Sequence, residues 1–381
     1  MDLTPLPYRA PIDQYQSQAA ALLDGWRAGD RAVMQTVRSN LPKLLRVDVP
    51  WLAKQMSEDD IRATPIDLAD TQLALARWYT FQNWERLVEY VEAVRTDGSP
   101  VHRFESAVEA VVGGDAAGLE SMLGANPDLV RARSTRVTPH DPPEHRATLL
   151  HYVAANGVEG HRQKSPANSV EIARTLLEAG AEADALAGMY GGQCTTMSML
   201  VSSEHPAKAG VQVPLVHTLV DYGAAVDGRG EGEWVSPLNT ALVFGYLAAA
   251  KALVTRGARV DSIVSAAGLG LVDDVRQMLP EADPERRHRA LAISALLGQT
   301  DVVRVLLDAG EDPNRFNPDG MHSHGTPLHH AACGGHDATV RLLVEHGARL
   351  DIKDLLWEAT PLGWAEYCGQ PGVAEYLRAR G

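Results

Sequence analysis

The chain has 381 residues, of which 45% are hydrophobic and 22% charged, the composition of a globular protein rather than of a disordered or fibrous one. Its formal net charge is −14, and a protein this acidic is repelled by nucleic-acid phosphates and anionic membranes unless it carries a strong basic patch. Its lysines and arginines form no such cluster, so we expect no nucleic-acid partner and no membrane partner.

The cysteines and the N-terminal residues indicate the cellular compartment in which the protein works. Cys194, Cys333 and Cys368 are odd in number and far apart, which predicts reduced thiols rather than a disulfide framework. The N-terminus has early acids and prolines and lacks the apolar segment of a signal peptide. No uninterrupted apolar stretch reaches the length of about 18 residues that a membrane span needs. We therefore expect a cytoplasmic protein.

Residues 1–100 contain no repeat. "AAALLDGWRAGDRAVMQTVRSNLPKLL" predicts two short helices, the second beginning near Asp30, and "PIDLADTQLALARWYTFQNWERLVEYVEAV" predicts two more, separated near residues 80–83. Four aromatic residues gather at that break: Trp78, Tyr79, Phe81 and Trp84. We expect them to pack as a cap over the array that follows, because the end of a stacked array must cover an apolar face. An exposed docking patch is the alternative.

A repeat begins near Arg103. TPLHHAACGGHDATVRLLVEHGARLD (326–351) aligns with SPLNTALVFGYLAAAKALVTRGARVD (236–261) and, less closely, with about six further segments. Thr-Pro opens a first helix, where proline is tolerated, and Gly335 and Gly347 suit left-handed helix ends. One helix pair cannot bury its apolar face alone, whereas stacked pairs can. The pattern predicts an all-α solenoid of about eight helix-pair repeats, several near a 33-residue period.

These motifs resemble the ankyrin-repeat family. The resemblance covers residues 103–381 and rests on TPLHHAA, VRLLVEHGA and the recurrent GA-x-x-D endings. The whole chain looks like bacterial ankyrin-repeat proteins in which a helical segment precedes the array. It implies an N-terminal helical capping segment over residues 1–100 and an ankyrin-repeat array over residues 101–381. The resemblance implies protein binding and carries no general catalytic activity.

Two insertions interrupt the period, near residues 156–169 and 204–214. Insertions of this kind fall in loops on one face of a solenoid, often the binding face. Between them, Gly191 and Gly192 could let the backbone of a hairpin turn tightly. The two insertions could therefore enclose a pocket for a small molecule, or they could be tolerated surface loops. The polar candidates for this alternative pocket are His151, His161, Arg162, Lys164, His205 and Gln212, with Tyr190 beside them.

A partner-binding surface follows from the resemblance, which implies contacts through hairpin tips and the exposed end of each first helix. Aromatic residues recur in these positions, and the cores of protein interfaces are rich in them. Our candidates are His145, Arg146, Asn156, Tyr190, Gln193, Ser202, Glu233, Trp234, Phe244, His322, His324, Cys333, Trp357, Glu358 and Tyr367.

The motifs of several enzyme classes are missing: the phosphate-binding loop, the H-E-x-x-H zinc helix and the G-x-S-x-G elbow. We therefore expect a binding module rather than an enzyme, with no cofactor and with a protein partner whose surface is basic or mixed. A small-molecule ligand, or catalysis by histidines in the alternative pocket, remains the second hypothesis.

Residues 321–337 hold five histidines and one cysteine. His329 and His336 occupy slots where the resemblance implies scaffold roles. His322 and His324 are two residues apart in a hairpin, so their side chains could share a face. His330 and Cys333 are three apart on a helix and could contribute to a zinc site. We nevertheless expect no metal, and we assign the hairpin pair to partner contact.

Overall fold

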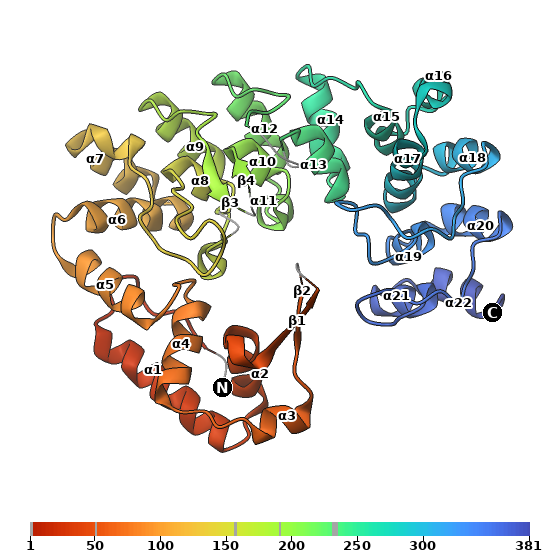
Figure 1. Ribbon diagram of the computed structural model, residues 1–381. Helices are drawn as coiled ribbons and strands as arrows, with labels where there is room; N and C mark the ends of the chain where they lie inside the picture. Colours follow the sequence, from red (N-terminus) through yellow and green to blue (C-terminus); the bar gives the residue numbers. More distant parts are fainter. Residues whose placement is uncertain (1–2, 50–51, 156–157, 190–191, 231–234) are drawn as a thin grey trace. The chain divides into compact units, whose positions relative to one another are not determined.

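The computed structural model describes residues 3–49, 52–155, 158–189, 192–230 and 235–381. The chain divides into two compact units, unit 1 over residues 1–223 and unit 2 over residues 224–381. Each unit consists mainly of helices (Figure 1). In the described parts of the chain, no helix is both long and apolar enough to cross a membrane.

Unit 1 begins with helices that belong to no repeat. Asp30 caps α2, Asp67 closes a capping box on α4, and Asn83 caps α5, so polar N-caps set these helix starts. The break predicted near residues 80–83 is confirmed. The elements of this segment are α1 (Ile12–Arg27), α2 (Arg31–Asn40), η1 (Pro42–Leu44), β1 (Leu45–Val49), β2 (Leu52–Gln55), α3 (Glu58–Ala63), α4 (Leu68–Trp78) and α5 (Trp84–Arg95).

Two features of this segment bear on the predictions. β1 and β2 pair as an antiparallel hairpin, which the expectation of an all-α chain missed. Tyr79 and Phe81 are buried in the segment's hydrophobic core, and Trp78 and Trp84 pack partly buried against it. The aromatic residues at the break therefore form core rather than a docking patch, and α5 packs against α6, the first helix of the array.

Eight helix pairs follow in the described residues. Those of unit 1 are α6 (Pro100–Gly113) with α7 (Ala116–Ala125), α8 (Leu149–Val153) with α9 (Ser169–Glu178), and α10 (Thr196–Leu200) with α12 (Gln212–Asp221). Those of unit 2 are α13 (Pro237–Val243) with α14 (Leu247–Thr255), α15 (Ile263–Leu269) with α16 (Val272–Met278), α17 (Pro284–Leu296) with α18 (Thr300–Asp308), α19 (Pro327–Cys333) with α20 (Asp337–Glu345), and α21 (Pro361–Tyr367) with α22 (Pro371–Arg378).

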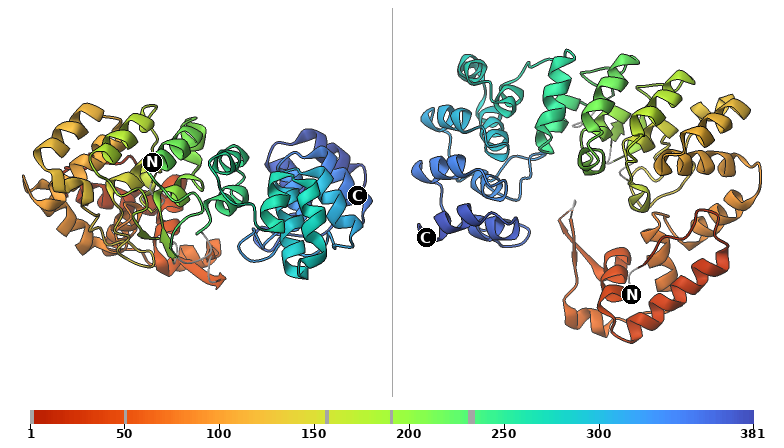
Figure 2. Two further views of the ribbon diagram at one scale, coloured as in Figure 1. Left: turned by 90° about the horizontal axis from the view of Figure 1, so that it is seen from above. Right: turned by 180° about the vertical axis from the view of Figure 1, so that it is seen from behind.

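The pairs of unit 2 stack in two layers. The first helices α15, α17, α19 and α21 lie side by side, and the second helices α16, α18, α20 and α22 form the other layer (Figures 1 and 2). Gly335 and Gly347 have left-handed φ values of 69° and 87°, as predicted for helix ends. The predicted stacking of helix pairs is thus confirmed.

The two insertions contain short helical elements. Between α8 and α9 lies η3 (Gly160–Arg162), and between α10 and α12 lies α11 (Glu204–Lys208), where a loop was expected. β3 (Ala187–Met189) and β4 (Gly192–Cys194) form the predicted hairpin that precedes α10. Other short elements are η2 (Pro127–Arg131) and η4 (Leu279–Glu281).

The cysteine prediction is wrong for two of the three residues. Cys333, at the end of α19, and Cys368, after α21, form a disulfide with Cα atoms 5.2 Å apart. Their separation of 35 residues in sequence is close to one repeat period, so stacking brings the same position of two neighbouring pairs together. Cys194 is a buried free thiol, and burial raises its pKa.

Candidate functional site

In unit 2, large aromatic side chains are exposed at the ends of first helices and in the connections that precede first helices. Phe244 follows α13 and Tyr367 ends α21, while Phe316 and Trp357 lie in the connections that precede α19 and α21. Their side chains are 42%, 93%, 36% and 65% exposed, respectively. We call these four residues the aromatic surface. Three of them, all but Phe316, are among the residues predicted for partner contact.

Asp354 fixes the connection that carries Trp357. Its carboxylate Oδ1 accepts hydrogen bonds from the backbone N–H of Leu356 (2.8 Å) and Trp357 (2.7 Å), and Oδ2 accepts from the backbone N–H of Ala359 (2.9 Å) and from Trp364 Nε1 (3.0 Å). Burial acts to raise the pKa of Asp354, but these donors prevail and lower it. Sequence reasoning missed this residue, although an aspartate in a short turn is a common backbone cap.

We expect Asp354→Ala to lower the free energy of unfolding of unit 2 by about 3 kcal/mol, because hydrogen bonds to a charged acceptor are each worth roughly 1.5–3 kcal/mol and four donors lose their partner. Urea denaturation followed by circular dichroism measures the change. The exposed Asp351→Ala, whose carboxylate pairs with Arg349, is the control and should cost less than about 1 kcal/mol. Equal effects of the two substitutions would contradict this role.

The hairpin histidines gather beside the aromatic surface. The ring of His324 lies 6.2 Å from that of His322, 5.3 Å from that of Trp357 and 5.5 Å from that of Trp364, between centroids. His330 joins them, 5.2 Å from His322. The prediction that His322 and His324 share a face is consistent with this contact. His322 is exposed, His324 is half-buried, and His322 Nε2 lies 3.2 Å from the carbonyl of Val243.

His330 is the buried member of this group. It is 6% exposed, and its Nε2 has no hydrogen-bond partner within the described residues. Burial, and then the neighbouring His322 and His324, lower its pKa to about 3, so its ring is neutral at physiological pH. Cys333, the other residue considered for zinc, is held in the disulfide. Across the described ranges, no three His, Cys, Asp or Glu side chains are grouped so that they could hold a metal ion.

A groove of about 740 Å³ adjoins the aromatic surface in unit 2. Leu242 and Val243 of α13, next to Phe244, form part of its wall, and Met321, next to His322, forms another. Two local ion pairs at the start of α17 also line it, Arg286 with Asp283 (3.3 Å) and Arg289 with Glu285 (3.5 Å). Asp261 also lines it. The groove therefore combines apolar side chains with charged ones, of which three are acidic and two basic, and lies close in sequence to exposed aromatic rings.

The remaining predicted contact residues have varied surroundings. Arg146, Gln193 and Glu358 are exposed. Ser202 is half-buried, and its hydroxyl donates a hydrogen bond to the carbonyl of Met199. The prediction for His145 is wrong: it is buried, and its Nε2 lies 3.2 Å from Glu159 Oε1. Four predicted residues lie outside the described residues: Asn156, Tyr190, Glu233 and Trp234.

Several histidines serve as scaffold. His329 Nδ1 bonds with the Thr326 hydroxyl (2.8 Å), and its Nε2 reaches the carbonyl of Ala359 in the next pair (3.2 Å). His336 Nε2 reaches the carbonyl of Leu296 in the preceding pair (2.9 Å). Both scaffold interpretations are confirmed. His151 has the same arrangement as His329, with Thr148 and with the carbonyl of Cys194.

The alternative pocket is therefore assembled only in part. His151 is buried scaffold, and Gln212 is buried with its amide donating to the carbonyl of Leu200 (3.0 Å), so both side chains are engaged within the repeats. His205 lines a recess of about 190 Å³ with Gln163, whose Oε1 lies 3.3 Å from His205 Nε2.

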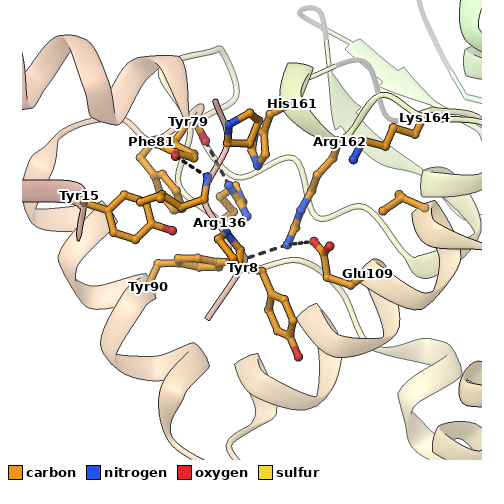
Figure 3. Close-up of a pocket in the computed structure, with 14 residues that line it drawn as sticks. Tyr8, Tyr15, Tyr79, Phe81, Tyr90, Glu109, Arg136, His161, Arg162 and Lys164 are labelled. Atoms are coloured by element: carbon orange, nitrogen blue, oxygen red, sulfur yellow. Dashed lines mark hydrogen bonds and ion pairs between the residues drawn. The ribbon is translucent and has the colours of Figure 1, made fainter. Parts of the chain in front are cut away.

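The other three predicted residues line a pocket of about 290 Å³ in unit 1 (Figure 3). His161, Arg162 and Lys164 come from the first insertion, as expected. The opposite wall was not predicted, because it comes from residues 5–8 and from Tyr15 of α1. The rest of the lining is Tyr79, Phe81, Tyr90, Glu109, Val112 and Arg136.

A buried ion cluster supports this pocket. Arg162 donates to Glu105 (2.5 Å) and to Glu159 (3.2 Å), and Arg136 lies 3.5 Å from both carboxylates. All four side chains are buried. Although burial acts to raise the pKa of Glu159, Arg136, His145 and Arg162 hold it well below its ordinary value. Three separate parts of the chain contribute, so no local sequence pattern revealed the cluster.

Comparisons with known proteins agree with this architecture. A family model described as ankyrin repeats (3 copies) matches residues 291–381. The human cyclin-dependent kinase 4 inhibitor B is 37% identical over 132 residues, which are 34% of this chain and 93% of that protein. The human cyclin-dependent kinase inhibitor 2A is 35% identical over 124 residues, 31% of this chain and 76% of that protein.

Two further matches are more distant. The Caenorhabditis elegans ankyrin repeat and KH domain-containing protein mask-1 is 29% identical over 219 residues, 55% of this chain but 8% of that protein. The crystal structure of the human ASB11 ankyrin repeat domain has a TM-score of 0.37 and 19% identity, and the match covers 72% of this chain and 97% of that one. These relatives are animal proteins, so they do not support the resemblance to a bacterial subgroup. The family match and the coverage of the human inhibitors show that the chain belongs to the ankyrin-repeat family.

Proposed function

We propose that this protein binds a protein partner through the aromatic surface and the adjoining groove of unit 2. The observation that carries the proposal is the set of four exposed aromatic side chains at the ends of α13 and α21 and in the connections that precede α19 and α21. Interface cores are enriched in aromatic residues, and a few such anchors supply most of the binding free energy. Two relatives are named as inhibitors of kinases, that is, as proteins that act on other proteins, which also supports a protein partner.

The charge around the aromatic surface suggests the partner's chemistry. Glu358 and Asp319 are exposed beside Trp357 and Phe316 in sequence, and Asp261 lines the groove. The chain as a whole carries a net charge of −14. We therefore expect a partner segment that inserts an apolar side chain into the groove and places basic side chains at its acidic rim.

The double substitution Trp357→Ala with Tyr367→Ala tests the surface. Both side chains are largely exposed, so the fold should survive, whereas the loss of two anchors should weaken binding at least tenfold. The immobilised full chain, the double variant and a Tyr222→Ala control are compared for capture from a native extract by quantitative mass spectrometry. Tyr222 is an exposed aromatic residue of unit 1.

The proposal is supported if at least one protein is captured equally by the unmodified chain and the Tyr222→Ala control, and at least tenfold less by the double variant. Addition of about 0.5 M salt should also weaken that capture, because exposed charge pairs are screened. Equal capture by all three chains, or no capture above background, contradicts the proposal.

A further inference from the structure

The pocket of about 290 Å³ in unit 1 is independent of the aromatic surface of unit 2. At a share of about 30 Å³ per water molecule, its volume equals roughly ten waters, which is the size of a small organic molecule. Its lining combines the rings of Tyr8, Tyr15, Tyr79, Phe81, Tyr90 and His161 with the cationic side chains of Arg136, Arg162 and Lys164.

The wall formed by residues 5–8 is fixed in place. The backbone N–H of Leu6 donates to the Tyr79 hydroxyl (2.9 Å), which itself donates to Gln18 Oε1 (3.0 Å). The hydroxyl of Tyr8 lies 3.0 Å from that of Ser106, and Arg9 pairs with Asp97 at 2.6 Å. These contacts hold the N-terminal segment against the end of α4 and against α6. The wall of the pocket that this segment forms is therefore held in a defined position.

Two polar groups of the pocket lack protein partners. The Tyr15 side chain as a whole is 2% exposed, and its hydroxyl, which is not among the fully buried atoms, makes no hydrogen bond to the described residues. Figure 3 shows that hydroxyl pointing away from α1 toward the other lining residues. His161 Nδ1 is also buried without a hydrogen-bond partner in the described part of the chain. A buried polar group without a partner, such as His161 Nδ1, costs free energy, and the unpaired Tyr15 hydroxyl can donate a hydrogen bond to a ligand in the pocket.

The protonation states of these groups suit an anionic ligand. Burial, and then Tyr79, raise the pKa of Tyr15 to about 12, so its hydroxyl stays a neutral donor. Burial, and then Arg136 and Arg162, lower the pKa of His161 to about 3, so its ring is neutral and can donate one N–H. Burial is the larger cause for His161, and the contribution of the arginines shows that the ring also lies in a positive local field.

Cationic side chains outnumber the carboxylates that face the pocket. Arg136, Arg162 and Lys164 line it, with Glu109 as a lining carboxylate, whereas Glu105 and Glu159 are not among the lining residues. Glu109 already pairs with Arg162 at 2.9 Å. The exposed ammonium of Lys164 makes no ion pair within the ranges that the structure describes. It is therefore available to a ligand's negative charge at the mouth of the pocket.

We propose that this pocket binds a small aromatic carboxylate. Its ring lies among Tyr15, Tyr79 and Phe81, and its carboxylate accepts hydrogen bonds from Tyr15 and His161 and pairs with Lys164. Aromatic rings pack favourably at centroid distances of 4.5–7 Å in offset or edge-on geometry. The rings of Tyr15 and Tyr79 already lie edge-on at 5.1 Å, as do those of Tyr79 and His161 at 5.5 Å.

Benzoate is the probe, with benzamide as its uncharged analogue and inorganic phosphate as an anion without a ring. Each is titrated into the full chain by isothermal calorimetry or ligand-detected NMR. The variants are Tyr15→Phe and Lys164→Met, with the remote Tyr222→Phe as control. Tyr15→Phe removes only a hydroxyl that has no protein partner, so the melting temperature of the ligand-free protein should stay the same or rise.

We expect benzoate to bind at least tenfold more tightly than benzamide or phosphate. Tyr15→Phe and Lys164→Met should each weaken benzoate at least tenfold, and Tyr222→Phe should leave it unchanged. Absence of benzoate binding overturns the proposal, as does equal binding of benzoate and benzamide or an unchanged affinity in both pocket variants. Tighter binding of phosphate would replace the aromatic carboxylate by an inorganic anion and overturn it too.

Discussion

We expect the substitution Arg162→Met to lower the free energy of unfolding of unit 1 by about 4 kcal/mol. Removal of one partner from a buried ion pair typically costs 3–5 kcal/mol, because the remaining charge is left buried without compensation. Here the loss leaves Arg136 as the one arginine of the described residues that faces both Glu105 and Glu159. Methionine keeps most of the side-chain volume, so the cost is mainly electrostatic rather than a cavity.

Urea denaturation followed by far-UV circular dichroism gives the change for Arg162→Met, and hydrogen exchange in α6 and α8 locates it in unit 1. Arg86→Met is the matched control, since Arg86 forms an exposed pair with Glu89 and should cost no more than about 0.5 kcal/mol. A loss below about 1 kcal/mol for Arg162→Met would falsify the assignment of the cluster as an essential support of unit 1.

The second large effect is destabilisation in mild acid. The pKa of His151 is lowered to about 4, and those of His161 and His330 to about 3, in each case mainly by burial. In the unfolded chain each histidine has a pKa near 6.5. Their contribution to stability is therefore present above pH 6.5 and falls as the pH drops from 6.5 toward the folded values, because the unfolded chain binds the protons.

At pH 5 each of these histidines should reduce stability by about 2 kcal/mol relative to neutral pH. Burial also lowers the pKa of His140 in unit 1 and of His288, His324 and His329 in unit 2, so both units should lose stability at pH 5. Chemical denaturation at pH 7 and pH 5 measures this difference. His330→Phe, which keeps an aromatic ring and cannot titrate, should recover about 2 kcal/mol of the loss in unit 2. An unchanged pH dependence in that variant would show that His330 is not responsible.

The array could be predicted from the sequence because each unit carries its own local signals. The Thr-Pro start, the glycine ends and the apolar stripe act within one helix pair, so aligning the copies was enough to separate the scaffold residue His329 from its neighbour His330. The β1–β2 hairpin has no such signal. The disulfide between Cys333 and Cys368 could have been inferred from the repeat period, but cysteine spacing alone suggested free thiols.

Only one wall of the pocket in unit 1 could be predicted from the sequence, because only that wall carries a local signal. An insertion that breaks the period drew attention to His161, Arg162 and Lys164. Tyr15 lies in an ordinary amphipathic helix, and nothing in its sequence neighbourhood shows that it lines a pocket together with an insertion some 150 residues away. Likewise, Glu105 sits in α6 like any surface glutamate, and its burial depends on Arg136 and Arg162 from later segments. Long-range pairs of this kind exist only in the folded chain.

The disulfide between α19 and α21 changes how the C-terminal end can open. Terminal units of a repeat array contact a single neighbour, so they are ordinarily the first to fray. Here α21 and α22 cannot separate from the array without remaining attached to α19. While the bond is intact, the end of the chain opens as one cooperative block of two pairs. A thiol reductant would divide that block and make the segment that carries Trp357 and Tyr367 an independently fraying unit.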